Sequence, residues 1–209
     1  MQKGFARPGY YFIDPHGIIR EKFFEARYRE RLTGNSIISA LFPELGEEVT
    51  ATIEAPHLQL ALEQSDRTGV PGTRITLAAS VRLPSDVHVY APGAQGYRPI
   101  KLVLDPMTGL EFKPVIYPQS KTLFLPVINE RVPVFDGTFR IRQDVMVNSG
   151  SEFAASLGKD GKTFTISGKL EYQACDQTKC YLPTSLPVQW QLQVSPLDRV
   201  RAPENVRHK

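Results

Sequence analysis

Strict alternation of apolar and polar residues near the C-terminal end is the feature that most constrains the fold of this chain. In Val188-Gln-Trp-Gln-Leu-Gln-Val194 every second residue is apolar, and glutamines stand between them. Successive side chains of a strand point to opposite faces, so this segment predicts a strand with one buried face and one solvent-facing side. We expect Val188, Trp190, Leu192 and Val194 to face the interior.

Similar short runs recur upstream, separated by turn signals. The clearest runs are Arg74–Val81, Ile100–Leu104, Phe139–Ile141 and Phe164–Tyr172. Turn signals lie at Val70-Pro-Gly72, Pro92-Gly93, Asp105–Gly109, Asp136-Gly137 and Lys159–Gly161. Eight to ten short strands with turns at this spacing predict a mainly-β protein, an immunoglobulin-like antiparallel β-sandwich in two sheets.

The chain divides into three parts in this interpretation. Residues 1–45 differ in pattern from the rest, residues 46–195 form the sandwich, and the charged, proline-containing residues 196–209 form a tail. Residues 46–56 are expected to be the crossing into the sandwich, and residues 148–162 a polar connection between strands.

The first part predicts a β-hairpin followed by a short helix. Two apolar runs flank the turn Pro15-His-Gly17, which predicts a hairpin over residues 9–24. Thr33 stands at an N-cap position before a helix over residues 34–42, whose apolar face would carry Ile37, Ile38, Leu41 and Phe42. Pro43 ends that helix. A lone hairpin and helix are marginally stable, so we expect them to pack against apolar surface.

Residues Arg7–Arg31 resemble the closing part of a peroxiredoxin of the AhpC/TSA type, which has a thioredoxin-like fold. The shared pattern is a proline, a strand ending in Ile13-Asp14, a glycine turn and a second strand. Pro8 stands where such proteins carry a cis-proline. No CxxC motif and no peroxidatic cysteine precedes this segment in the sequence.

Composition and charge argue against two broad classes of function. The net charge is only +3, and its basic residues are scattered, which does not favour nucleic-acid binding. No run of apolar residues is long enough for a membrane span. Residues Met1–Tyr10 have no apolar core, so we expect no signal peptide there.

The chemical signal is a close pair of cysteines, Cys175 and Cys180, between the predicted strands 164–172 and 188–194. If those strands pair, the cysteines face each other across the turn. Directly opposed residues have Cα atoms about 4.5–5.5 Å apart, within the range of about 4.4–6.8 Å that a disulfide needs. A disulfide is therefore easy to form here.

Three interpretations of the pair remain open from the residues alone. A purely structural bridge would close a loop of only six residues and add about 2 kcal/mol, which a chain of this length does not need. A zinc site needs further ligands. The histidines are far apart in sequence, at His16, His57, His88 and His208. We therefore expect no metal and no cofactor, and favour a redox pair that cycles between dithiol and disulfide.

The segment Gly168–Val188 resembles the N-terminal domain of the disulfide reductase DsbD, in the frame Tyr-Gln-x-Cys, Cys-x-x-Pro and Pro-Val. Pro84–Tyr90, Ile116-Tyr-Pro118 and Val132–Gly137 match other parts of that family, so the resemblance covers about residues 50–195. It implies an immunoglobulin-like domain that passes electrons from a thioredoxin-like redox protein or domain to client thiol proteins, and it suggests the periplasm. The sequence departs from the familiar pattern in its shorter cysteine spacing and in Leu182, where proline is common.

Neighbouring residues suggest roles within the pair. Lys179 adjoins Cys180 and would favour its thiolate, whereas Asp176 adjoins Cys175 and would oppose ionisation there. Cys180 is therefore the expected nucleophile, as the family's second cysteine is, and Cys175 the resolving thiol. Candidates to shield the pair are Tyr90, Tyr117 and Tyr181. His88 is expected to be a packing or hydrogen-bonding residue.

Overall fold

The computed structural model describes residues 9–24, 31–42, 48–126, 129–148, 153 and 156–195. The single helix of this described part is α1 (Gly34–Leu41). The strands are β1 (Gly9–Ile13), β2 (Ile19–Phe24), β3 (Arg31–Leu32), β4 (Glu48–Ala55), β5 (Leu58–Gln64), β6 (Thr68–Gly69), β7 (Thr73–Arg82), β8 (His88–Tyr90), β9 (Lys101–Leu104), β10 (Leu110–Ile116), β11 (Lys121–Leu125), β12 (Glu130–Asp136), β13 (Thr138–Val147), β14 (Thr163–Tyr172), β15 (Ala174–Cys175) and β16 (Thr184–Val194).

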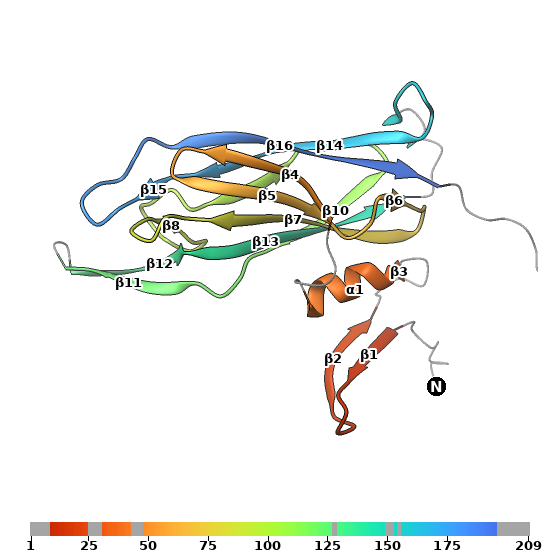
Figure 1. Ribbon diagram of the computed structural model, residues 1–209, viewed down its shortest axis with the longest axis horizontal. Coiled ribbons are helices and arrows are strands. Elements are labelled where there is room, and N and C mark those ends of the chain that lie inside the picture. The colour runs from red at the N-terminus through yellow and green to blue at the C-terminus, as the bar shows by residue number, and fades with distance from the viewer. Residues whose placement is uncertain are drawn as a thin grey trace, which may run out of the picture.

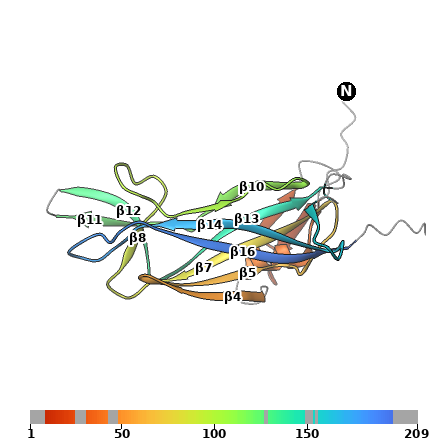
Figure 2. The same ribbon diagram turned by 90° about the horizontal axis from the view of Figure 1, so that it is seen from above.

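Three sheets build the main body. One sheet has the order β10-β13-β7-β5-β4, with β3 added in parallel to β7. The second sheet, β6-β16-β14-β9, lies over it, and the third, β11-β12-β8-β15, extends the body at one end (Figures 1 and 2). Most strand pairs are antiparallel, and the predicted mainly-β, immunoglobulin-like sandwich is confirmed. The predicted number of two sheets is wrong, because β8, β11, β12 and β15 pair in a separate third sheet.

The core forms between the first two sheets from the alternating apolar positions. Trp190 is 0% exposed, and its indole N–H donates to the backbone oxygen of Glu63 on β5, 2.9 Å away. Val188 and Leu192 are also buried, and Val194 packs partly buried against the same cluster. The predicted inward face of this strand is confirmed.

The strand count and one linker differ from the prediction. Thirteen strands follow residue 47 in the described part of the chain, because β6, β8 and β15 are only two or three residues long and show no alternation. Residues 46–56 are not a simple crossing, since Glu48–Ala55 is the edge strand β4. Its partner β5 buries every second residue, as its Leu58-Gln-Leu-Ala-Leu-Glu-Gln64 sequence dictates.

The hairpin and helix of the N-terminal part are confirmed, with Thr33 accepting from the backbone N–H of Ser36 as the N-cap. The predicted apolar face of the helix is wrong. Ser36 and Ser39 are buried, whereas Ile38 is 40% exposed. The helix turns its serines toward the sheet because polar groups there bond them.

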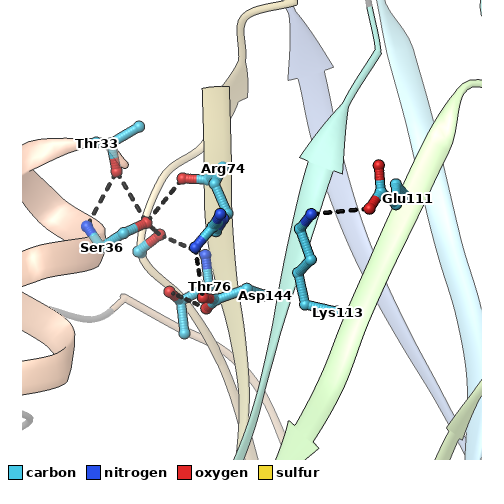
Figure 3. Close-up of polar contacts among 8 residues, drawn as sticks. Thr33, Ser36, Arg74, Thr76, Glu111, Lys113 and Asp144 are labelled. Carbon is cyan, nitrogen blue, oxygen red and sulfur yellow. Dashed lines mark hydrogen bonds and ion pairs between the residues drawn. The ribbon is translucent and has the colours of Figure 1, made fainter. Parts of the chain in front are cut away.

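Those polar groups form a network that we call the α1 cluster: Thr33, Ser36, Ser65, Asp66, Arg74, Thr76 and Asp144. Figure 3 labels five of them, Thr33, Ser36, Arg74, Thr76 and Asp144. The Ser36 hydroxyl donates to the backbone oxygen of Arg74 at 3.0 Å and lies 3.1 Å from the Ser65 hydroxyl. The Thr33 hydroxyl donates to Asp66 at 2.7 Å. Because buried hydroxyls must be paired, this network fixes the helix on β7.

The β1–β2 hairpin lies apart from the sandwich, beyond α1 (Figure 1). Phe12 packs edge-on against Phe42 at 5.4 Å, whereas Tyr11, Ile13, Ile19 and Phe24 are exposed. Most apolar side chains of the hairpin are therefore left exposed among the described residues, which differs from the expected apolar packing. Pro8, Pro43, the tail 196–209 and part of 148–162 lie outside the described residues.

Candidate redox site

The cysteines lie in a loop between β14 and β16, residues 173–183, which we call the cysteine loop. β14 and β16 pair up to Tyr172 and Thr184, as expected. Beyond that point the chain leaves their sheet, and β15 joins the third sheet instead, where Cys175 stands opposite His88 of β8. The cysteines therefore do not sit on a continuation of the β14–β16 hairpin, because β8 holds one of them.

Cys175 and Cys180 form a disulfide within an isolated antiparallel bridge. The two ends of the bond differ in access. Cys175 is 1% exposed and packs in a small apolar cluster with Tyr90, Val132 and Val134, whereas Cys180 is exposed. Cys180 is therefore the more accessible of the two cysteines to a reagent from solvent.

Asp176 organises the turn between the cysteines. Its carboxylate accepts from the backbone N–H groups of Thr178 and Lys179, from the Thr178 hydroxyl and from the Tyr181 hydroxyl. These hydrogen bonds, that of Tyr181 foremost, hold the pKa of Asp176 well below its usual range. The same bond to Asp176 raises the pKa of Tyr181.

Tyr181 ties the cysteine loop to the turn between β4 and β5. Its ring stacks on the imidazole of His57 with centroids 3.6 Å apart, and the Lys179 ammonium lies 5.2 Å from the Tyr181 ring centroid. His57 has φ 64°, the left-handed region that few residues adopt. The hydroxyl of Tyr172 donates to the oxygen of neighbouring Pro56 at 2.8 Å. Sequence reasoning missed His57, because only the fold brings this turn to the loop.

Tyr90 is the tyrosine that reaches a cysteine. Its hydroxyl lies 3.7 Å from the Cys180 sulfur, and its ring stacks on Tyr97, whose hydroxyl donates to Glu130. Burial, and then the charge of Glu130, raise the pKa of Tyr90. Tyr117 is placed elsewhere: it stacks on Phe135 and packs partly buried against the sandwich core.

His88 lies beside the disulfide on the third sheet. It stands opposite Cys175 on one side and opposite Asp136 of β12 on the other. Its Nε2 atom is buried and has no hydrogen-bond partner in the described part of the chain. Burial lowers the pKa of His88, against the opposing charges of Asp136 and Asp176. The imidazole is therefore neutral near neutral pH.

The surface next to Cys180 is open and partly apolar. Leu182 is 87% exposed, and Pro183 borders a pocket of about 310 Å³ that Tyr97, Lys101 and Tyr172 also line. Within the described residues no three His, Cys, Asp or Glu side chains gather as metal ligands. None of the helical structure in the described ranges is long and apolar enough to cross a bilayer.

Comparison with known proteins agrees with this geometry. Residues 59–189 match the family model described as thiol:disulfide interchange protein DsbD, N-terminal. No match was found among curated proteins.

Two solved structures are similar at low identity. The N-terminal periplasmic domain of ScsB from Proteus mirabilis has a TM-score of 0.46 and 12% identity, covering 68% of this chain and 51% of that one. The chain thus spans about half of the length of that structure. The reduced N-terminal domain of DsbD from Neisseria meningitidis has a TM-score of 0.37 and 13% identity, covering 56% and 80%.

The family match covers more than half of the sequence and includes both cysteines, β8 and the cysteine loop. The chain therefore belongs to the family of the N-terminal domain of the thiol:disulfide interchange protein DsbD.

Proposed function

We propose that residues 46–195 form a thiol–disulfide exchange domain that passes reducing equivalents through Cys175 and Cys180. The electrons would come from a thioredoxin-like redox protein or domain and go to client thiol proteins. The observation that carries this proposal is the unequal exposure of the two cysteines, since Cys180 is an exposed residue and Cys175 a buried one. A bridge that only stabilised the fold would gain nothing from presenting one cysteine.

The exchange follows from that asymmetry. A partner thiolate attacks the Cys180 sulfur, the Cys175–Cys180 bond breaks, and the electron pair stays on Cys175. The partner's second thiol then attacks its own sulfur in the mixed disulfide, which leaves both cysteines of this domain reduced. The reduced domain then passes the electrons on. The Cys180 thiolate attacks a client disulfide, and Cys175 resolves the mixed disulfide.

Leu182 and the nearby pocket support a protein partner. An aliphatic side chain left 87% exposed beside the reactive sulfur provides apolar contact area for an incoming surface. We propose that it contacts the thioredoxin-like partner during attack on Cys180.

A trapping experiment tests the assignment of roles. The probe is a thioredoxin that keeps only its attacking cysteine, loaded with thionitrobenzoate. Reduced Cys175→Ser should displace the thionitrobenzoate and accumulate a mixed disulfide on a non-reducing gel, because no second thiol releases it. Cys180→Ser should give neither the colour nor the band. Trapping by Cys180→Ser alone would reverse the roles.

The alternative is a non-catalytic module whose disulfide is only structural. Structural disulfides have reduction potentials below about −300 mV, whereas exchange pairs lie higher. We expect a potential above that limit, since the closed loop is short and one cysteine is exposed. A bridge below it that also resists thioredoxin would favour the structural alternative.

The N-terminal resemblance to AhpC/TSA peroxiredoxins stays a prediction. The exposed apolar face of the β1–β2 hairpin is consistent with a segment that completes a thioredoxin-like domain. The second alternative function, a peroxiredoxin relative with the sandwich as accessory, requires a peroxidatic cysteine. Of the two cysteines in this sequence, both lie in the disulfide.

A further inference from the structure

Three side chains stand in a row across the third sheet at the buried end of the disulfide. Asp136 of β12 is paired with His88 of β8, and His88 is paired with Cys175 of β15. Directly opposed residues point to the same face of a sheet with Cβ atoms about 4.5–5.5 Å apart. The His88 ring also meets the Tyr90 ring edge-on at 5.7 Å, so it lies on the side where Tyr90 reaches Cys180.

The imidazole of His88 is incompletely satisfied in the disulfide form. Its Nε2 atom is buried without a hydrogen-bond partner among the described residues. A buried polar atom of this kind is costly and asks for an explanation. The cross-strand neighbour, Cys175, has no proton while it is bonded to Cys180, but gains one when the bond is reduced.

We propose that His88 is the proton acceptor for Cys175 when Cys175 resolves a mixed disulfide. This inference rests on the proposed exchange function and adds a residue to it. In the dithiol form, the buried nitrogen of His88 accepts a hydrogen bond from the Cys175 thiol. In the disulfide form that partner is lost, which accounts for the unpartnered nitrogen.

The resolving step balances as follows. Cys180 is bonded to the client sulfur, and Cys175 carries a thiol. His88 takes the thiol proton, the Cys175 thiolate attacks the Cys180 sulfur, and the Cys175–Cys180 bond forms. The Cys180–client bond breaks and its electron pair leaves on the client sulfur. His88 releases its proton to solvent, and the client thiolate takes up one proton from solvent in exchange. Two electrons pass from the dithiol to the client disulfide, and His88 returns to its neutral state.

The charges around His88 suit this role. Burial keeps the resting ring neutral, so its nitrogen is unprotonated, but burial also makes the ring a weaker base. The carboxylates of Asp136 and Asp176 act on the ring from β12 and from the cysteine loop, and both stabilise the imidazolium once it forms. Tyr90 contributes only a neutral ring edge, since its pKa is raised.

The first test measures the ionisation of Cys175 without any exchange. In full-length Cys180→Ser the single thiol is Cys175, and its thiolate absorbance is followed against pH. His88→Gln keeps a polar side chain but cannot take the proton, so the Cys175 thiolate loses the imidazolium that would stabilise it. Adding this change should raise the apparent pKa of Cys175 by about one unit. Adding His16→Gln, in the remote hairpin turn, should change nothing. Equal thiol pKa values with and without His88 would overturn the proposal.

The second test follows resolution with oxidised glutathione as the probe. Reduced protein is mixed with it, quenched, and analysed for the Cys180–glutathione adduct by mass spectrometry. His88→Gln should lengthen the adduct's lifetime about tenfold near neutral pH and converge with wild type well above the ordinary thiol pKa of about 8.5. A deficit independent of pH would indicate a packing role instead and contradict the proposal.

The two tests separate this inference from the proposed function. A wild-type domain that fails to exchange with thioredoxin would overturn the function, yet the thiol pKa of Cys175 would still decide the role of His88. If His88→Gln unfolds, the His88 ring signals of wild-type protein provide the readout. They should show a pH step coincident with Cys175 ionisation in the reduced protein only, and its absence would refute the proposal.

Discussion

The two ends of β7 carry two polar clusters with opposite properties. At its start, the α1 cluster joins the buried hydroxyls of Ser36, Ser65 and Thr76 to partly buried carboxylates, and these groups bond to one another (Figure 3). Beyond its end, β8 supports the cysteine loop, where one cysteine is exposed and a buried imidazole nitrogen has no partner in the described residues.

This difference in hydrogen bonding and exposure distinguishes polar groups that stabilise the fold from polar groups that can react. Ser36 and Thr76 have satisfied hydrogen bonds and cannot change state without breaking them. By contrast, Cys180 is exposed to a reaction partner, and the buried Nε2 atom of His88 has no hydrogen-bond partner in the described part of the chain. We therefore expect substitutions at the first cluster to affect stability and substitutions at the second to affect exchange.

The largest effect should come from Cys180→Ser, which breaks the bridge at its exposed end. Exchange with thioredoxin should be lost entirely, because the attacking sulfur is gone. The free energy of unfolding should fall by only about 2 kcal/mol, the loop-entropy contribution of so short a closed loop. Urea unfolding and thionitrobenzoate release measure the two quantities. Substantial residual exchange would mean that the assignment of the nucleophile is wrong.

The reverse pattern is expected for Ser36→Ala in the α1 cluster. This change removes the hydrogen bonds that the buried Ser36 hydroxyl makes with Thr33, Ser65 and the backbone oxygen of Arg74. It should lower the free energy of unfolding by about 1–3 kcal/mol. The rate of exchange should stay at the wild-type value, measured below the unfolding transition. Exposed Ser120→Ala is a surface control for the urea titration. A change in exchange rate for Ser36→Ala would contradict the separation of the two clusters.

Tyr90→Phe tests whether the tyrosine hydroxyl next to Cys180 affects the reactivity of the cysteine pair. The lost hydroxyl would otherwise donate to the Cys180 thiolate in the reduced protein, so its removal should raise the thiol pKa. We expect exchange near neutral pH to slow roughly three- to tenfold, with little change in unfolding. Tyr117→Phe, which removes the hydroxyl of a tyrosine that stacks on Phe135, is the matched control. Equal rates for Tyr90→Phe and wild type would refute a role for this hydroxyl.

Leu182→Ser should act only on protein partners. Loss of apolar contact should slow exchange with loaded thioredoxin about fivefold, while the reaction with a small aromatic disulfide keeps its rate. The ratio of the two rates is the measurement. A parallel fall in both would place Leu182 in the intrinsic reactivity of Cys180 instead.

The smallest effect concerns the charge of Asp176. Because hydrogen bonds depress its pKa, the carboxylate stabilises the loop above the ordinary Asp pKa of about 3.9, and this contribution is lost as pH falls through the lower folded value. The amide signals of Thr178 and Lys179 should therefore shift only below the usual Asp range. A transition at the ordinary value would show that these hydrogen bonds do not form in solution.

The alternation of apolar and polar residues predicted strands that have one buried and one exposed face. It gave no prediction for short strands, which are defined only by the strands they pair with. Residues 188–194 show their inward face directly, and β5 has the same signal in its leucines. β8 and β15 are too short for any pattern, and their pairing places Cys175 beside His88. The helix face was misjudged because buried serines are favourable only where Ser65 and Arg74 supply partners.

The parts of the site that lie in the cysteine motif, or next to it in the sequence, could be predicted. The close cysteine pair and its family frame identified the disulfide, and Tyr90 and Tyr181 do lie at the loop. The sequence placed Lys179 and Asp176 by adjacency alone, whereas Asp176 bonds across its own turn. His57 and Tyr97 carry no local signal, since strands remote in sequence bring them to Tyr181 and Tyr90.

The buried indole of Trp190 gives this protein a built-in optical probe. It is the chain's one tryptophan, fully enclosed between the sheets. Its emission should be blue-shifted in the native state and move to longer wavelength when the sandwich opens. Tyrosines, by contrast, surround the cysteines, so difference spectra of their absorbance follow the loop. One sample can therefore show, at two wavelengths, whether a reductant has changed only the bond or melted the domain.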